Sequence, residues 1–103
     1  MTAYDKGYHF ELRVQGYLEK LGWDVMRSGG SHGPADLIAL GPSKVLLVQC
    51  QVGKYMSKDK KEALVALATR NACQYGFAYR VGNKMLFSES VEECKRENTR
   101  LLL

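Results

Sequence analysis

Residues 36–52 read DLIALGPSKVLLVQCQV. This stretch holds two strand-length segments, 36–40 and 45–52, separated by the four residues GPSK. Glycine, proline and serine are typical of turns, and short apolar runs bounded by turns are typical of strands. We therefore predict two strands joined by a short turn and paired in the antiparallel direction.

The residues before this hairpin predict a helix and one further strand. Four apolar residues are spaced by four, four and three positions, which places them on one face of a helix over 5–21. They are Phe10, Val14, Leu18 and Leu21. Gly22 suits the left-handed cap that ends a helix, residues 23–27 alternate like a strand, and residues 28–34 predict a loop. Short connections between the three strands favour an antiparallel meander.

The residues after the hairpin predict a second helix, two strands and a last helix. Their predicted ranges are 58–74, 77–81, 84–87 and from Ser90 onward. Ser57 is a good N-cap and Gly76 follows the second helix, while Gly82-Asn83 fits a two-residue hairpin turn. Ser90-Val91-Glu92-Glu93 matches a capping box, which predicts the C-terminal helix. A helix between the third and fourth strands favours a parallel crossover there.

This order predicts an α/β fold with a mixed sheet flanked by helices, and 103 residues suit one domain over 1–103. No apolar run approaches the ~20 residues that span a bilayer, and the first residues lack a signal-peptide core, so we expect an intracellular, cytoplasmic protein. Cys50, Cys73 and Cys94 form no Cys-x-x-Cys pair, which argues against a zinc site. The net charge of +4 permits a polyanionic partner.

Polar side chains cluster at the ends of the predicted hairpin strands. Asp36 opens one strand, and Gln49 and Gln51 share one face of the next because strand side chains alternate. The antiparallel pairing makes Asp36 and Gln49 cross-strand neighbours, and Glu11 on the first helix can reach the same place. Carboxylate oxygens hold Mg²⁺ in proteins, so this layout favours a divalent-metal site for phosphodiester hydrolysis.

The pattern resembles the PD-(D/E)xK nuclease superfamily and, within it, the Holliday junction resolvases of archaeal and phage type. The resemblance runs over residues 6–68 and rests on the order and spacing of five short motifs. They are Lys6-Gly7, Phe10-Glu11, RSGGS at 27–31, ADLIA at 35–39 and LVQCQ at 47–51. It implies a restriction-endonuclease-like core and a metal-dependent endonuclease.

The resemblance also implies the metal ligands. Glu11 corresponds to the helix-one acid, Asp36 to the central metal-binding aspartate, and Gln49 to the second acidic position, where an amide oxygen can still face the metal. The backbone carbonyl of Cys50 would be a further ligand. The implied ion is Mg²⁺, with Mn²⁺ as a substitute, and the implied assembly is a homodimer that cuts a four-way DNA junction.

DNA contacts follow from the same resemblance. Ser31 corresponds to the family's loop serine and Arg27 to a phosphate contact, and Lys6 lies in the first motif. Four further basic residues flank the start of the second predicted helix and could track a DNA backbone, although a solvated helix end is the alternative. They are Lys54, Lys58, Lys60 and Lys61.

The chain departs from the family at Gln51, where the pattern has lysine. Glutamine donates a hydrogen bond but carries no charge that could offset phosphate. Three explanations stay open: an engineered inactivating substitution, a natural loss of cleavage that leaves a junction-binding protein, or Lys54 reaching back into the site. Together Glu11, Asp36, Gln49, Gln51 and Lys54 are the candidate catalytic residues.

Structural explanations compete with these roles. Asp36 can close a turn, Glu11 can be a solvated helix residue, and the two glutamines can lie on an edge strand. Three functions therefore remain: a junction resolvase, a junction-binding module without cleavage, and a nuclease for other branched DNA. The apolar tail 101–103 and the second helix are candidate dimer surfaces, and a phage origin is compatible with the resemblance.

Overall fold

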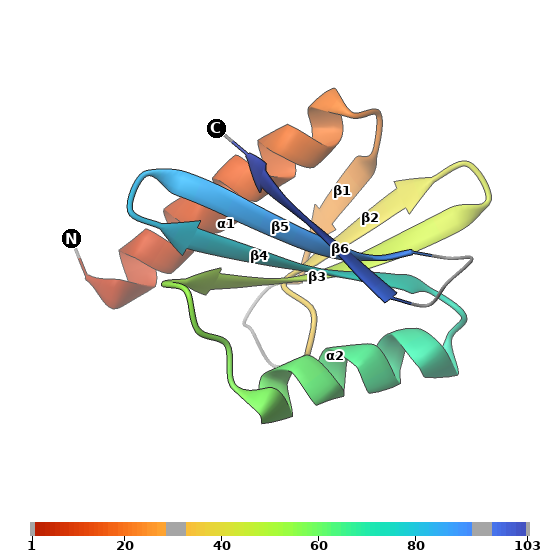
Figure 1. Cartoon of the computed structure of the whole chain (residues 1–103). Coiled ribbons are helices and arrows are strands. Elements are labelled where there is room, and N and C mark those ends of the chain that lie inside the picture. Colours follow the sequence, from red (N-terminus) through yellow and green to blue (C-terminus); the bar gives the residue numbers. More distant parts are fainter. Residues whose placement is uncertain (1, 29–32, 92–95, 103) are drawn as a thin grey trace.

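The computed structural model of the chain describes residues 2–28, 33–91 and 96–102. These residues form two helices and six strands (Figure 1). The elements are α1 (Ala3–Lys20), β1 (Asp24–Arg27), β2 (Leu37–Gly41), β3 (Lys44–Val52), α2 (Lys58–Arg70), β4 (Gln74–Val81), β5 (Lys84–Val91) and β6 (Arg96–Leu102). The strands form one sheet in the order β1-β2-β3-β4-β5-β6.

The sheet confirms the predicted meander and crossover. β1, β2 and β3 pair in the antiparallel direction, and Leu37 lies opposite Val48. β3 and β4 pair in parallel, with α2 as the connection between them. The remaining pairs of the described strands, β4 with β5 and β5 with β6, are antiparallel. The sheet is therefore mixed, as predicted.

The first helix confirms the predicted apolar face, but it runs over Ala3–Lys20 rather than 5–21. Phe10, Val14 and Leu18 are at most 2% exposed. Thr2 and Asp5 form a capping box at its start, which the sequence reading did not identify. Leu21 was expected on the same buried face, but it is 57% exposed because the helix ends at Lys20 and the chain turns away.

The two helices cover opposite faces of the sheet, which explains the uninterrupted apolar run of β3. Leu46, Val48 and Cys50 belong to the core cluster under α1, whereas Leu47 belongs to the cluster under α2. Alternate side chains of β3 thus enter two separate cores. Within the described residues, no helix is long and apolar enough to cross a membrane.

The second helix is shorter than predicted. It ends at Arg70 rather than at residue 74, and the Cys73 N–H bonds the carbonyl of Ala68 at 2.8 Å as the chain leaves the helix. Gln74 already pairs with β3. Gly76 lies inside β4, where a Cβ atom would come within 2.9 Å of the Phe87 ring, so this glycine serves close packing and not a helix cap.

The predicted C-terminal helix is wrong. β5 continues through Ser90 to Val91, and residues 96–102 form the strand β6 beside it. The Ser90 hydroxyl accepts a hydrogen bond from the Tyr75 N–H of β4 at 3.0 Å, so it pairs with a strand backbone and does not cap a helix. Pairing with a neighbouring strand outweighed the local capping motif. Glu92 and Glu93 of that motif lie outside the described residues, as does Leu103 of the apolar tail.

Candidate active site

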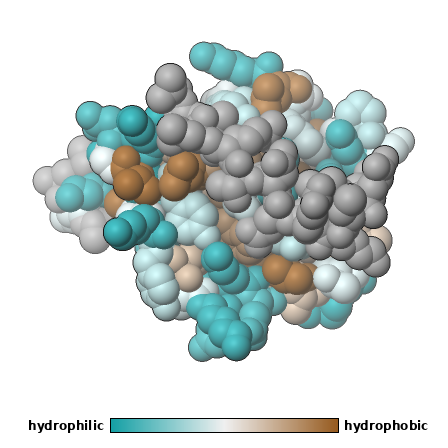
Figure 2. Space-filling model, in the orientation of Figure 1, coloured by the Kyte–Doolittle hydropathy of each residue, from teal (hydrophilic) through white to brown (hydrophobic). Residues whose placement is uncertain are grey.

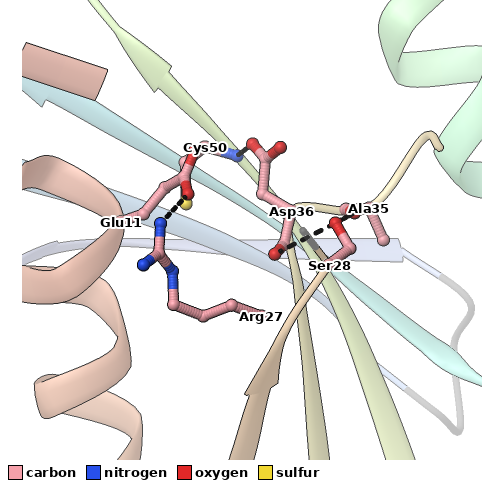
Figure 3. A network of polar contacts seen from close by, with 6 residues as sticks. All are labelled: Glu11, Arg27, Ser28, Ala35, Asp36 and Cys50. Atoms are coloured by element: carbon pink, nitrogen blue, oxygen red, sulfur yellow. Dashed lines mark hydrogen bonds and ion pairs between the residues drawn. The ribbon is translucent and has the colours of Figure 1, made fainter. Parts of the chain in front are cut away.

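Asp36 is fixed by the strands on both of its sides (Figure 3). On the β3 side its N–H donates to the Val48 carbonyl at 2.8 Å, and one carboxylate oxygen accepts from the Cys50 N–H at 3.0 Å. On the β1 side its carbonyl accepts from the Ser28 N–H at 3.0 Å. The β2–β3 register continues to this point and makes Gln49 its neighbour, as predicted. Asp36 is only 8% exposed.

Ser28 contributes a contact that the sequence reading missed. Its hydroxyl donates to the Ala35 carbonyl at 2.6 Å and so closes the neck of the loop that precedes Asp36. A serine at the first position of a glycine-rich loop is the signal that could have indicated this role, because serine hydroxyls commonly bond nearby backbone groups.

A hollow of about 290 Å³ opens beside the Asp36 carboxylate. It is lined by Glu11, Gly33, Pro34, Asp36, Gln49, Cys50, Lys60 and Ala63. The structure thus brings together all four residues predicted as metal ligands, from α1, from the start of β2 and from β3. A side-chain amide, two carboxylates and a backbone segment supply oxygen donors of the kind that Mg²⁺ prefers.

The hollow is an unfavourable place for a negative charge. Burial is the main reason why the pKa of Asp36 is raised, and the nearby Glu11 carboxylate raises it further. The hydrogen bond from the Cys50 backbone is the largest opposing effect, followed by the charges of Lys60 and Arg27. A bound divalent cation would relieve this cost, so the electrostatics fit a cation site.

Glu11 is held by Arg27 and not left to solvent. The guanidinium Nη2 lies 2.7 Å from the Glu11 Oε1 atom, and the Arg27 Cζ atom lies 4.5 Å above the centre of the Tyr8 ring. The hydrogen bond with Glu11 raises the pKa of Arg27. In the structure Arg27 orients an acid of the hollow and leaves the second Glu11 oxygen for other partners, and its predicted contact with phosphate stays a prediction.

The two glutamines of β3 lie in different surroundings. Gln49 is 7% exposed, and its amide nitrogen makes a long hydrogen bond of 3.5 Å to the Cys50 carbonyl. Gln51 is half-buried, and its amide oxygen accepts from the Lys60 ammonium at 3.3 Å. The thiol of Cys50 packs in the core, where burial raises its pKa well above the ordinary value, so only the backbone of Cys50 is suited to hold a cation.

The structure does not bring Lys54 to the hollow. Gly53 has a positive φ of 108°, and Lys54 follows it as an exposed residue that is not part of the lining. Lys60 lines the hollow instead, from the first turn of α2. The sequence reading grouped Lys60 with a general basic cluster, because the path of residues 53–57 cannot be read from composition.

The remaining predicted DNA contacts are spread over the surface. Lys6 is exposed on α1, and Lys58 is exposed at the start of α2. Ser31 lies outside the described residues. Figure 2 shows a hydrophilic surface over the beginning of α2, where Lys58 lies. Of the described basic residues that flank the start of α2, only Lys60 lines the hollow.

A mixed sheet in this order, with one helix on each face and an acidic hollow at the ends of β2 and β3, defines the α/β class with a restriction-endonuclease-like fold. The family model described as "Archaeal holliday junction resolvase (hjc)" matches residues 2–101. The chain belongs to the archaeal Holliday junction resolvase family.

Two relatives agree with this assignment. A protein of Methanocaldococcus jannaschii named "Crossover junction endodeoxyribonuclease Hjc" is 34% identical over 88 residues, which cover 82% of this chain. The match spans 65% of the length of that relative. The structure of Hjc from Archaeoglobus fulgidus, described as a Holliday junction resolvase from an archaeal hyperthermophile, gives a TM-score of 0.65 at 25% identity and covers 77% of this chain and 72% of that chain.

Proposed function

We propose that this chain is a metal-dependent endonuclease that binds four-way DNA junctions as a homodimer and hydrolyses one phosphodiester bond per subunit. Family membership supports the substrate class. The observation that carries the chemistry is the convergence of Glu11, Asp36, Gln49 and Cys50 on one hollow. In the reaction a water oxygen bonds to phosphorus while one phosphorus–oxygen ester bond breaks, leaving a phosphate end and a hydroxyl end.

The donor set fits Mg²⁺ but carries less charge than three carboxylates would. Among the described residues no group of three His, Cys, Asp or Glu side chains could hold a metal ion. In the hollow the carboxylates of Glu11 and Asp36 would bind the ion with the amide oxygen of Gln49 and the carbonyl of Cys50. When bound, Mg²⁺ activates a water and offsets charge on the phosphate.

The protein's own residues prepare this site. Arg27 keeps Glu11 directed toward the hollow, and the Cys50 N–H fixes one oxygen of Asp36, which leaves the other oxygen for the ion. Because burial raises the pKa of Asp36, a proton competes with the ion for this carboxylate more strongly than at an ordinary carboxyl. We expect Mn²⁺ to substitute for Mg²⁺, since both accept oxygen ligands.

Cleavage of a labelled synthetic four-way junction with Mg²⁺ tests the proposal. We expect cutting by the unaltered chain and its loss, by about 1,000-fold, in Asp36→Asn, because a removed ligand charge weakens both metal binding and phosphate activation. Junction binding by Asp36→Asn should persist. Absence of both binding and cutting in the unaltered chain would contradict the proposal.

A junction-binding protein without cleavage is the second candidate. The observation that favours it is the pair Gln49 and Gln51, which replaces one acid and the lysine of the family pattern. Binding without cutting by the unaltered chain, together with cutting gained in Gln51→Lys, would establish this alternative.

A further inference from the structure

Lys60 occupies a fixed place at the wall of the hollow. It is the third residue of α2, and its N–H donates to the hydroxyl of the N-cap Ser57 at 3.2 Å. Lys60 and Ala63, one turn later, both line the hollow. The helix start therefore sets where the lysine side chain begins, facing the side on which Asp36 and Gln49 lie.

The amide of Gln51 can be oriented in only one way between its two partners. Its nitrogen donates to the Val52 carbonyl at 3.1 Å, and its oxygen accepts from the Lys60 ammonium at 3.3 Å. A carbonyl cannot donate and an ammonium cannot accept, so turning the amide over would lose both bonds. Gln51 thus presents an acceptor to Lys60, where a lysine would present a second positive charge.

The other cations near the hollow are engaged elsewhere. Arg27 is held in the ion pair described above, and Lys58 lies 3.6 Å from Glu62 on the exposed side of α2. Lys61 lies over two aromatic rings of β4, at 5.6 and 6.0 Å from their centres. Within the part of the chain that the structure describes, Lys60 is the one cation that lines the hollow.

Helix stability does not account for a lysine at this position. The first turn of a helix carries a partial positive charge, so a cation there is unfavourable and an acid such as Asp59 is preferred. Lys60 is also exposed and contributes little to the core. Its contact with Gln51 and its place on the hollow wall are the two features that can explain a lysine at this position.

We propose that Lys60 supplies the positive charge that faces the scissile phosphate in this chain, and that Gln51 positions it. The inference rests on the proposed function. Lys60 thereby brings to the hollow, from α2, the charge that the family pattern carries at position 51, a residue that does not itself line the hollow. In this arrangement Lys60 is a catalytic residue because its ammonium would contact a phosphate oxygen, and Gln51 is a positioning residue that acts through Lys60.

Single-turnover cleavage of a four-way junction at saturating protein with Mg²⁺ tests the role of Lys60. We expect Lys60→Gln to slow cleavage by about 100-fold, as loss of one charged transition-state contact does. The dissociation constant of the junction, measured with Ca²⁺, should change by less than about threefold. Lys20→Gln makes the same charge change at the exposed far end of α1 and should leave the rate unchanged.

A double variant separates chemistry from structure. Lys60→Gln combined with Gln51→Lys returns an ammonium to the hollow from β3, so we expect it to regain at least about tenfold over Lys60→Gln alone. A merely structural role of Lys60 would not be rescued in this way. Gln51→Leu keeps the volume but removes the acceptor, and we expect kcat to fall about tenfold with KM unchanged.

Three outcomes would overturn the inference. The first is a Lys60→Gln variant that cuts as fast as Lys20→Gln. The second is an unaltered chain that binds the junction without cutting while Gln51→Lys cuts, because Lys60 would then not serve as the cation. The third is a failure of the unaltered chain and of Gln51→Lys to bind the junction at all, which would remove the proposed function itself.

Discussion

The two walls of the hollow are held by different kinds of contacts. On the acid wall, Glu11 is fixed by a guanidinium at 2.7 Å and Asp36 by a backbone N–H at 3.0 Å. On the α2 wall, Lys60 meets a neutral amide at 3.3 Å and is exposed to solvent. The acid wall is therefore built from charge-assisted or buried bonds, and the α2 wall from a weaker one.

The two walls therefore serve different tasks in the site. Bonds in a buried setting are stronger and fix geometry before a ligand arrives, whereas an exposed ammonium can adjust its reach. Substitutions on the acid wall should therefore change stability and cation binding. Substitutions on the α2 wall should change the reaction rate and leave the folded state nearly as stable.

The largest expected effect on cation binding comes from adding charge to the acid wall. Gln49→Glu introduces a third carboxylate into the hollow, and we expect the dissociation constant for Mn²⁺ to fall by about tenfold or more, because divalent-ion affinity rises with ligand charge. Isothermal titration calorimetry would measure it. Asn83→Asp, in the β4–β5 turn, is the matched control, and equal affinities in the two variants would show that residue 49 does not face the ion.

Removing Arg27, the partner of Glu11, should destabilise the protein, and a bound metal ion should restore part of the lost stability. We expect Arg27→Met to lower the free energy of unfolding by about 2 kcal/mol in EDTA, since it leaves a partly buried carboxylate without its partner. Mg²⁺ should stabilise this variant more than it stabilises the unaltered chain. Denaturant titrations with and without the ion would measure this. Arg70→Met, at the end of α2, is the control. If Mg²⁺ stabilised Arg27→Met no more than it stabilises this control, the proposed difference between the two walls would be contradicted.

The helix caps offer a matched pair of smaller changes. Thr2→Ala and Ser57→Ala each remove a hydroxyl that caps a helix, and each should cost about 1 kcal/mol of unfolding free energy. Only Ser57→Ala should also slow junction cleavage, because Lys60 lies in the first turn of α2 whereas Glu11 lies nine residues beyond Thr2. If the two variants cleaved junctions at equal rates, the position of Lys60 would not depend on the cap at the start of α2.

The smallest expected effect concerns the pH dependence of the metal-free protein. The pKa of Asp36 is raised in the folded state, so ionising this group costs stability as pH rises from its unfolded pKa, ordinarily near 3.8, through the raised value. Asp36→Asn should therefore be more stable than the unaltered chain at pH 7, and this advantage should vanish at acidic pH. Denaturant titrations in EDTA across this range measure it, and a destabilised Asp36→Asn at pH 7 would contradict the cause assigned to the shift.

The sequence predicted the part of the fold in which neighbours along the chain are also neighbours in space. The hairpin of β2 and β3 follows from its apolar runs and turn, and the crossover follows from the helix between β3 and β4. The antiparallel register of β2 and β3 was sufficient to predict that Asp36 lies beside Gln49. Glu11 could be placed near the hollow because it follows Phe10, which belongs to the apolar face of α1 that packs on the sheet.

The wrong or incomplete predictions have physical causes that a local sequence pattern does not contain. Ser90 matches a helix cap, but its hydroxyl meets a backbone N–H of β4, a partner 15 residues away. Gly76 looks like the residue after a helix, but the Phe87 ring requires it inside a strand. Lys60 could not be distinguished from its lysine neighbours because its approach to Gln51 depends on how residues 53–57 cross from the sheet to the helix.

The strand order has a consequence for how the chain acquires its shape during synthesis. Each strand pairs with the one that precedes it in the sequence, so a growing chain can add strands one after another at the same edge of the sheet. The lining residues of the hollow that the structure describes fall between positions 11 and 63 and leave the ribosome before β4. Since a domain generally folds as a unit, and β4 and β5 contribute Phe77 and Phe87 to the two cores, we expect the acidic pocket to take its final form only after these strands have been translated.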